Sequence, residues 1–219
     1  MRVNEAFERV PPHDLCAVIR DRQPSALLLD IGGVLCPDPW ETIIGTPIAG
    51  LAARLENPRL MTQARLLWRE FALRPSIESD YWTALGIRAG VRIPLDLVEE
   101  ITTSLVRPFP WSAELLEAVP VDRLLIVSDN TSFWFARQDQ ALRLTGRSSH
   151  QFLSFREGLS KSSRPQGLLD LAVAKVGAHD VLFVDDRVAN VRRAVDLGLT
   201  ALLSVASDTA VPGSRDSAG

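Results

Sequence analysis

Short apolar runs and amphipathic stretches alternate along most of this chain. Each apolar run predicts a strand that is buried on both faces of a sheet. The runs cover residues 26–29, 124–128, 151–155, 181–184 and 200–204. Helical periodicity follows three of these runs, over residues 131–144, 167–176 and 188–197. Strands that alternate with helices in this way predict parallel βαβ units, so we expect an α/β fold with a doubly wound parallel sheet.

Residues 39–108 have a different pattern, with helical spacing of apolar residues and no strand-like run. The spacing is interrupted near Pro58 and Pro75, where the missing N–H of proline breaks a helix. It resumes over 76–85 and 94–106. We therefore expect a small helical domain inserted between the first two strands, of a size that could cover a site at the sheet edge.

The two ends of the chain are expected to lie outside the α/β core. Pro11-Pro12 predicts the start of a short helix in an N-terminal extension. The last residues are polar and rich in small side chains, which is typical of a flexible tail. The expected division is an N-terminal helical extension 1–24, an α/β core 25–38 and 109–207, a helical cap insertion 39–108 and a flexible tail 208–219.

Composition narrows the class of protein. The chain has 219 residues, 46% hydrophobic and 23% charged, which is typical of a globular protein. The net charge is −3, whereas nucleic-acid-binding domains usually carry excess positive charge, so nucleic acid is not an expected partner. No apolar run reaches the roughly 18 residues of a membrane span, and the first residues lack a signal-peptide core, so we expect no membrane partner. Cys16 and Cys36 have no metal-type spacing, which favours a reducing cytoplasm. The oligomeric state is not predicted.

Carboxylates follow two of the predicted strands. Asp30 ends the first strand and is followed, after Ile31, by Gly32 and Gly33, which let the backbone turn sharply beside a ligand. Asp185 and Asp186 end the fourth strand. Either group could instead start a turn or cap a helix. Two strands that deliver carboxylates to one sheet edge nevertheless suit Mg²⁺, which prefers oxygen ligands.

A hydroxyl and an ammonium group complete the candidate chemistry. Ser128 ends the second strand, where its hydroxyl could bond a phosphoryl oxygen or cap the next helix. Lys161 lies in the loop after the third strand and is one of only two lysines in an arginine-rich chain, the other being Lys175. A compact ammonium there could neutralise a phosphate and a nucleophile, or it could be a solvated charge.

In chain order these segments read Asp30-Ile-Gly-Gly-Val-Leu, Leu-Ile-Val-Ser128, Gly-Leu-Ser-Lys161 and Asp185-Asp186-Arg-Val-Ala-Asn190. They resemble the four motifs of the haloacid dehalogenase (HAD) superfamily over about residues 25–207. The inserted helices are similar to the cap domain of that superfamily. The branch that the chain resembles most contains the small sugar-phosphate phosphatases related to glucose-1-phosphate phosphatases and the N-terminal domain of epoxide hydrolases.

The resemblance implies a Mg²⁺-dependent phosphatase with an aspartyl-phosphate intermediate. The implied roles are Asp30 as nucleophile, Ser128 and Lys161 as phosphoryl-holding residues, Asp30, Gly32, Asp185 and Asp186 as metal ligands, and Asp129 and Asn130 as substrate-binding residues. The implied substrate is a small phosphorylated metabolite, with sugar phosphates as one candidate class.

Two positions depart from the superfamily pattern. Gly32 stands where phosphatases usually carry a second aspartate, the general acid and base. Glycine there predicts turnover that depends steeply on the leaving group, unless another residue supplies the proton. Ser162 stands where proline usually follows the lysine, which predicts a looser loop.

Two other functions are compatible with this sequence. One is a catalytically impaired HAD-like protein that binds a phosphorylated ligand or a protein partner, which Gly32 favours. The other is a dehalogenase that uses Asp30 on carbon. That reaction needs no metal, so the pair Asp185 and Asp186 speaks against it.

Overall fold

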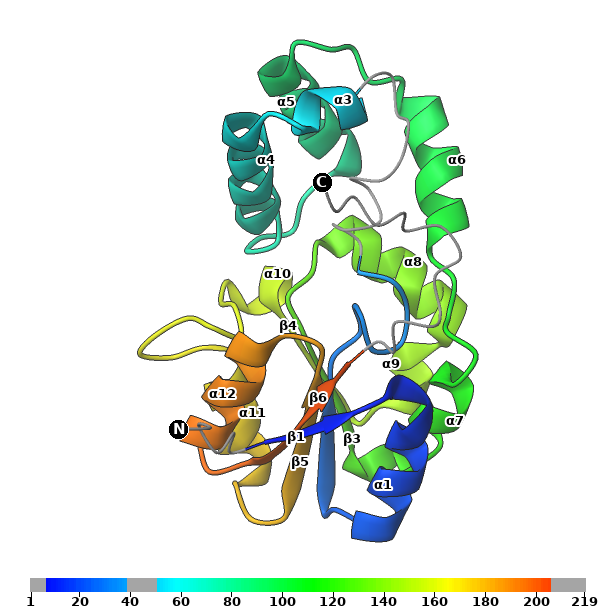
Figure 1. Ribbon diagram of the computed structural model, residues 1–219, viewed down its shortest axis with the longest axis vertical. Helices are drawn as coiled ribbons and strands as arrows, with labels where there is room; N and C mark the ends of the chain where they lie inside the picture. The colour runs from blue at the N-terminus through cyan, green and yellow to red at the C-terminus, as the bar shows by residue number, and fades with distance from the viewer. Residues whose placement is uncertain (1–6, 39–50, 206–219) are drawn as a thin grey trace, which may run out of the picture.

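The computed structural model describes residues 7–38 and 51–205. Within these residues the strands form one parallel sheet with the order β1-β6-β5-β2-β3-β4 (Figure 1). The strands are β1 Glu8–Val10, β2 Ala26–Leu29, β3 Leu124–Ser128, β4 His150–Leu153, β5 Val181–Asp185 and β6 Thr200–Ser204. The chain winds outward from β2 in both directions, which confirms the predicted doubly wound α/β fold.

Helices cover both faces of the sheet because alternate strand residues point to opposite sides. Leu27 and Leu29 belong to one apolar cluster with residues of α1, α7 and α8, whereas Leu28 belongs to another with residues of α11 and α12. These two sets of helices lie on opposite faces of the sheet (Figure 1). The helices of the core are η1 Pro12–Asp14, α1 Leu15–Arg22, α7 Ser112–Leu116, η2 Val121–Arg123, α8 Ser132–Leu142, α9 Leu144–Arg147, α10 Ser154–Glu157, α11 Leu168–Val176 and α12 Val188–Asp196. The sheet is thus buried between two apolar layers.

The predicted inserted helices form a third apolar cluster beyond the carboxyl edge of the sheet (Figure 1). They are α3 Leu51–Leu55, α4 Pro58–Phe71, α5 Glu78–Ala89 and α6 Leu95–Leu105. Helix α4 begins at Pro58, and the side chain of Asn57 caps it by accepting a bond from the Arg59 N–H at 3.0 Å. Tyr81 and Trp82 fill the cluster, and Trp134 of α8 packs into it from the core.

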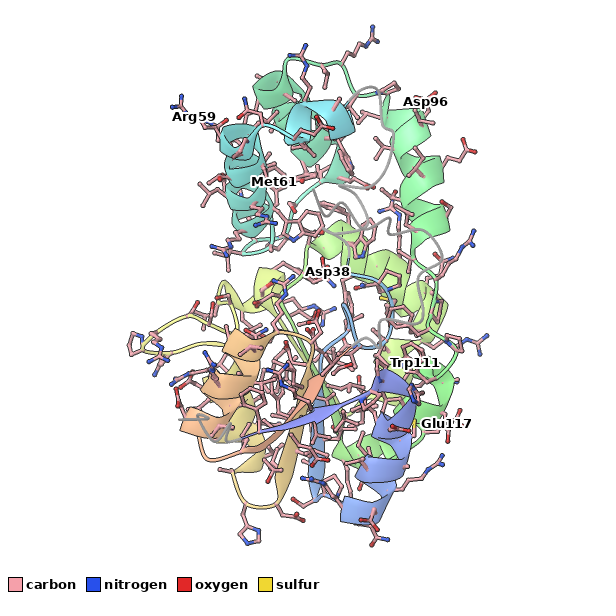
Figure 2. The ribbon with its side chains drawn as sticks, viewed as in Figure 1. Asp38, Arg59, Met61, Asp96, Trp111 and Glu117 are labelled. Atoms are coloured by element: carbon pink, nitrogen blue, oxygen red, sulfur yellow. The ribbon has the colours of Figure 1, made fainter. Side chains whose placement is uncertain are left out.

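The chain leaves the core for these helices and returns to it at neighbouring points. The Phe109 N–H donates to the Leu35 carbonyl at 2.9 Å, and the Trp111 indole N–H donates to the Val34 carbonyl at 3.0 Å. Asp38 lies at the junction between the sheet and the inserted helices (Figure 2). The two connections therefore lie side by side.

The N-terminal segment differs from its prediction as an extension outside the core. The expected helix is present as η1 and α1, and its residues Leu15 and Ile19 are buried in the main core. Glu8–Val10 adds a strand that pairs with β6, from Glu8 opposite Leu202 onward. Periodicity missed this strand because it is a short edge strand in which only Val10 is buried.

The third predicted strand is shorter than expected. It ends at Leu153, and Phe155 belongs to α10, which Gly158 terminates in a left-handed conformation at φ +69°. None of the helices in the described ranges is long and apolar enough to cross a membrane. The predicted tail and residues 39–50 of the predicted insertion lie outside the described residues.

Candidate active site

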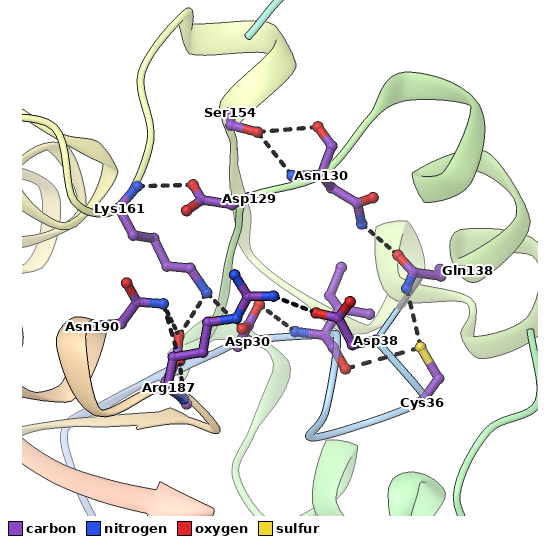
Figure 3. A network of polar contacts seen from close by, with 12 residues as sticks. Asp30, Cys36, Asp38, Asp129, Asn130, Gln138, Ser154, Lys161, Arg187 and Asn190 are labelled. Atoms are coloured by element: carbon purple, nitrogen blue, oxygen red, sulfur yellow. Dashed lines mark hydrogen bonds and ion pairs between the residues drawn. The ribbon is translucent and has the colours of Figure 1, made fainter. Parts of the chain in front are cut away.

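The predicted polar residues meet at the carboxyl edge of the sheet (Figure 3). β2 and β5 are neighbours, and the Asp30 N–H extends their pairing with a 3.0 Å bond to the Val184 carbonyl. Asp30, Ser128 and Lys161 line one small cavity of about 20 Å³, together with six further residues: Gly32, Asp38, Asp129, Asn130, Arg187 and Asn190. That volume holds about one water molecule. The prediction that the ends of these strands meet at one edge of the sheet is confirmed.

Lys161 lies at the centre of this site. Its ammonium Nζ is 2.6 Å from Asp30 Oδ2 and 2.6 Å from Asp185 Oδ2, and its side chain is 2% exposed. Burial opposes the charge on the ammonium, but Asp185 and Asp30 more than offset burial and hold the pKa of Lys161 well above its usual value. Lys161 is therefore a buried cation shared by two carboxylates, and the solvated-charge alternative is wrong.

The loop that carries Lys161 is held in place by its own hydrogen bonds. The Lys161 N–H donates to Asp129 Oδ1 at 2.8 Å, and the Ser160 N–H donates to Ser163 Oγ at 3.0 Å. A Cβ on Gly167 would lie 2.7 Å from the Ser160 carbonyl oxygen, so only glycine allows the following helix to pack so closely. These contacts define the position of the loop, and the looser loop predicted from Ser162 remains a prediction.

The two adjacent carboxylates after β5 have different surroundings. Both oxygens of Asp185 accept hydrogen bonds, from the Arg187 N–H at 2.8 Å, from Asn190 Nδ2 at 3.0 and 3.1 Å, and from Lys161. Oδ1 of Asp186 is buried and has no hydrogen-bond partner among the described residues. A buried carboxylate oxygen without a donor is costly. Asp186 therefore has an oxygen available for a ligand, whereas Asp185 is fully bonded.

The acidic groups fit the divalent cation that the resemblance implies. Oxygens of Asp30, Asp185 and Asp186 all lie within 4.8 Å of one another. With the ammonium of Lys161, the ionised groups carry a formal charge of −2, which one Mg²⁺ would neutralise. Gly33 makes room for this arrangement, because at its φ of +73° a Cβ would lie 2.2 Å from Asp186 Oδ2. The remaining predicted ligand, Gly32, lines the adjoining cavity.

The crowding of carboxylates also changes their acidity. Burial raises the pKa of Asp30 to about 7, against the lowering influence of Lys161. Burial, followed by the charges of Asp30 and Asp185, raises the pKa of Asp186 to about 8. In the absence of a cation, the site therefore holds protons up to neutral pH.

Ser128 ends β3 at the edge of the sheet that carries the site. It lines the cavity, and its hydroxyl makes no hydrogen bond to any of the described residues. The residue that precedes α8 as its N-cap is Thr131, so the alternative of Ser128 as a helix cap is wrong. The side chain of Asn130 is bonded to Gln138 at 2.5 Å and to the Thr131 N–H at 3.0 Å. Its predicted contact with substrate remains a prediction.

Sequence reasoning missed an ion pair at the cavity. Arg187 Nη2 lies 2.6 Å from Asp38 Oδ2, and both residues line the cavity (Figure 3). The signal for Arg187 was its place directly after Asp186, within a motif that had already been singled out. No signal marked Asp38, because it follows a turn rather than a strand.

Lys161→Met is expected to destabilise the metal-free protein by about 3 kcal/mol or more at pH 8, because it leaves buried carboxylates without their cation. The loss should be smaller at pH 5, where Asp30 and Asp186 are protonated. Urea unfolding in EDTA measures both values. Lys175→Met, at the only other lysine and an exposed position, is the matched control and should change stability by less than about 0.5 kcal/mol. Equal effects of the two variants would contradict the central role of Lys161.

Comparison with known proteins adds evidence at the level of the fold. The sequence matches no protein-family model and no curated protein. A HAD family enzyme from Bacteroides thetaiotaomicron is 15% identical, covers 85% of this chain and 96% of its own, and has a TM-score of 0.63. The same enzyme is known in complex with magnesium and inorganic phosphate, with a TM-score of 0.60.

Two other solved structures are similar over most of the chain. A predicted HAD-like family hydrolase from Porphyromonas gingivalis is 17% identical, with coverage of 86% of this chain and 95% of its own and a TM-score of 0.60. The L-2-haloacid dehalogenase from Xanthobacter autotrophicus is also 17% identical, with coverage of 81% and 76% and a TM-score of 0.53. All of these proteins share the fold described above.

Proposed function

We propose that this chain, which has the fold of the HAD-like hydrolase superfamily, is a Mg²⁺-dependent phosphatase that acts on a small phosphorylated metabolite. The observation that carries the proposal is the charge balance of the site. Asp30 and Asp185 share the ammonium of Lys161, an oxygen of Asp186 lies within 4.8 Å of oxygens of both, and a divalent cation would balance the remaining charge. A buried site of this kind suits a dianionic phosphoryl group that is held by a metal ion.

Asp30 is the nucleophile in this proposal. The Ile31 N–H bonds its Oδ1 at 2.7 Å and Lys161 bonds its Oδ2, so the orientation of the carboxylate is fixed. An oxygen of Asp30 attacks phosphorus, the bond from phosphorus to the leaving oxygen breaks, and an aspartyl-phosphate forms. Lys161 and the Ser128 hydroxyl hold the phosphoryl oxygens as their charge shifts.

Hydrolysis of the aspartyl-phosphate completes the cycle. A water attacks phosphorus, the bond between phosphorus and Asp30 breaks, and inorganic phosphate leaves. Mg²⁺, held by Asp30, Asp186 and the Gly32 carbonyl, would supply charge neutralisation for the phosphoryl group. Asp185, which is bonded to Lys161 and Asn190, would keep the ammonium in place.

The inserted helices α3–α6 are proposed to act as a cap that selects the substrate. They lie beyond the edge of the sheet that carries the site (Figure 1). The cavity measures only about 20 Å³, so we propose that the cap side moves when a phosphate ester enters. A sugar phosphate remains one candidate substrate, and a cytoplasmic location remains a prediction.

A dehalogenase is the second candidate, because a haloacid dehalogenase shares the fold. The same Asp30 would then attack carbon and displace halide. The two functions separate in one assay: hydrolysis of a panel of phosphorylated metabolites and of 2-chloropropionate, each with Mg²⁺ and with excess EDTA. We expect phosphate release that requires Mg²⁺. Halide release that is equal in EDTA would instead support the dehalogenase, and neither product would support the impaired protein that only binds.

Mg²⁺ is expected to stabilise the protein more at high pH than at low pH. The pKa values of Asp30 and Asp186 in the fold, about 7 and about 8, lie above the unfolded value of about 4. The folded state therefore holds these protons more tightly, and metal-free stability should fall as the pH rises from about 4 to about 8. Bound Mg²⁺ should remove that fall.

Thermal unfolding in EDTA and in Mg²⁺ tests this expectation. At about 100 times the Kd, Mg²⁺ should raise Tm by roughly 5–10 °C at pH 8.5. The rise should be much smaller at pH 5.5. NaCl at matched ionic strength serves as the control for general ionic effects. A Tm shift of the same size at both pH values would contradict the protonation of these carboxylates.

A further inference from the structure

A phosphatase needs a proton for most of its leaving groups, and the turn after Asp30 does not supply one. An alkyl oxyanion is a poor leaving group, and a positioned acid typically contributes about 10²- to 10⁴-fold to its departure. Gly32 has no side chain to donate. The donor must therefore come from another titratable side chain that lines the cavity. In the described part of the chain these are Asp30, Asp38, Asp129, Lys161 and Arg187.

Four of these five groups are committed to other contacts. Asp30 is the proposed nucleophile, and Lys161 is held between two carboxylates. Asp38 is paired with the guanidinium of Arg187 at 2.6 Å, which favours the ionised carboxylate. Arginine does not release its proton in proteins. Asp129 is the remaining candidate.

Asp129 is held differently from every other acid of the cavity. It directly follows Ser128, the proposed phosphoryl-holding residue at the end of β3, and it is half-buried. Its Oδ1 accepts a 2.8 Å bond from the backbone N–H of Lys161 (Figure 3). No donor among the described residues bonds its Oδ2. One oxygen is therefore fixed by a neutral donor, while the other can carry a proton toward the substrate.

We propose that Asp129 is the catalytic acid and base of this site, in place of the side chain that Gly32 lacks. The inference rests on the proposed phosphatase function. In the first step Asp30 bonds to phosphorus, the bond to the leaving oxygen breaks, and the proton of Asp129 passes to that oxygen to give an alcohol. In the second step the Asp129 carboxylate takes a proton from the attacking water, whose oxygen bonds to phosphorus as the bond to Asp30 breaks. Phosphate leaves, and Asp129 is protonated again.

The charges that surround Asp129 are consistent with this role. Burial raises the pKa of the Asp129 carboxyl, and the charge of Asp30 raises it further. Lys161 and, to a smaller extent, Arg187 act in the opposite direction. The net effect is upward, so the protonated form persists to higher pH than in an exposed aspartate.

The test is a leaving-group series with the wild type and with Asp129→Asn, in Mg²⁺. Asparagine keeps an oxygen that can accept the bond from the Lys161 N–H, so the loop should retain its position. Alkyl phosphate turnover should fall by about 10²- to 10⁴-fold. Aryl phosphates with acidic phenol leaving groups should be less affected. The rate of their first step, measured as the burst of released phenol, should fall by less than about 10-fold. Ionisation of Asp129 at high pH should lower alkyl phosphate turnover in the wild type, and this decline should be absent from Asp129→Asn.

Asp38→Asn is the matched control, since it changes the other non-nucleophilic acid of the cavity in the same way. It should leave the dependence on the leaving group as in the wild type. If Asp129→Asn lowered the turnover of alkyl and aryl esters equally, Asp129 would have a positioning role only, and the inference would be overturned. A change in selectivity confined to Asp38→Asn would also overturn it. Absence of hydrolysis of every ester by the wild type would overturn the proposed function itself, and this inference with it.

Discussion

Asp30→Asn is expected to remove Mg²⁺-dependent phosphate release, with a loss of roughly 10⁴-fold or more. An amide cannot form the acyl phosphate. The neighbouring Asp185 is also held by Lys161 and by a backbone N–H, but both of its oxygens accept further bonds from Asn190, so it is not expected to replace Asp30 as nucleophile. The fold should survive, because asparagine has nearly the same shape. Stability at pH 8 in EDTA should stay equal or rise, since burial makes the ionised Asp30 costly in the folded state. Turnover and thermal unfolding are the two measurements.

The matched control for this variant is Asp122→Asn, the same chemical change at an exposed position before β3. It should keep wild-type turnover and wild-type Tm. Wild-type turnover by Asp30→Asn would exclude a covalent mechanism through this residue. A large fall in Tm together with the loss of turnover would instead show that Asp30 is needed for folding.

Asp186→Asn is expected to lower Mg²⁺-dependent turnover by about 10³-fold or more, because the metal contributes several kcal/mol to such reactions. The oxygen Oδ1 of Asp186 is buried and has no donor among residues 7–38 and 51–205, which makes it the available ligand of the acidic pair. The rise in Tm that Mg²⁺ causes at pH 8.5 should also be lost. Mg²⁺ titrations of turnover and of Tm measure both effects.

Asp185→Asn provides the comparison, since both of its oxygens already accept hydrogen bonds from Lys161, Asn190 and the Arg187 N–H. This variant should lose more stability in EDTA than Asp186→Asn and retain more of its Mg²⁺ response. The reverse order, with Mg²⁺ affinity lost only in Asp185→Asn, would make Asp185 the direct ligand. It would also mean that the bonds to Asn190 rearrange when the metal binds.

The sheet was predictable from the sequence because its central strands are buried on both faces. Runs such as 124–128 and 200–204 have the same bounds in the structure, since an unbroken apolar run has no other stable place in a fold of this size. The strand at Glu8–Val10 was not predictable by the same signal. An edge strand with one buried residue has the pattern of a loop, and only its pairing with β6 identifies it.

The meeting of the site residues was predictable, but their individual contacts were not. Parallel strands place their carboxyl ends at one edge, so Asp30, Ser128 and Asp185 had to lie near one another. No sequence pattern shows that Asn190 occupies both oxygens of Asp185, which leaves Asp186 with the unpartnered oxygen. Such differences depend on side-chain geometry within a few ångströms.

Because the two connections to the inserted helices lie side by side, the inserted segment could be replaced without rebuilding the core. The Phe109 N–H donates to the Leu35 carbonyl, so the chain leaves the core and returns to it at adjacent points. For the core, the inserted segment is equivalent to a long loop between these two residues. Insertions are tolerated where chain ends lie close together on a scaffold. A different module could therefore be exchanged at this point without altering the order of the strands that carry the site. Trp134 sets one condition, because it packs into the inserted cluster and any replacement module must cover it. The inserted helices contact α8 through Trp134 and through the polar contacts of Ser132 with Ser76 and of Arg137 with Glu78, and a replacement module would have to match this surface.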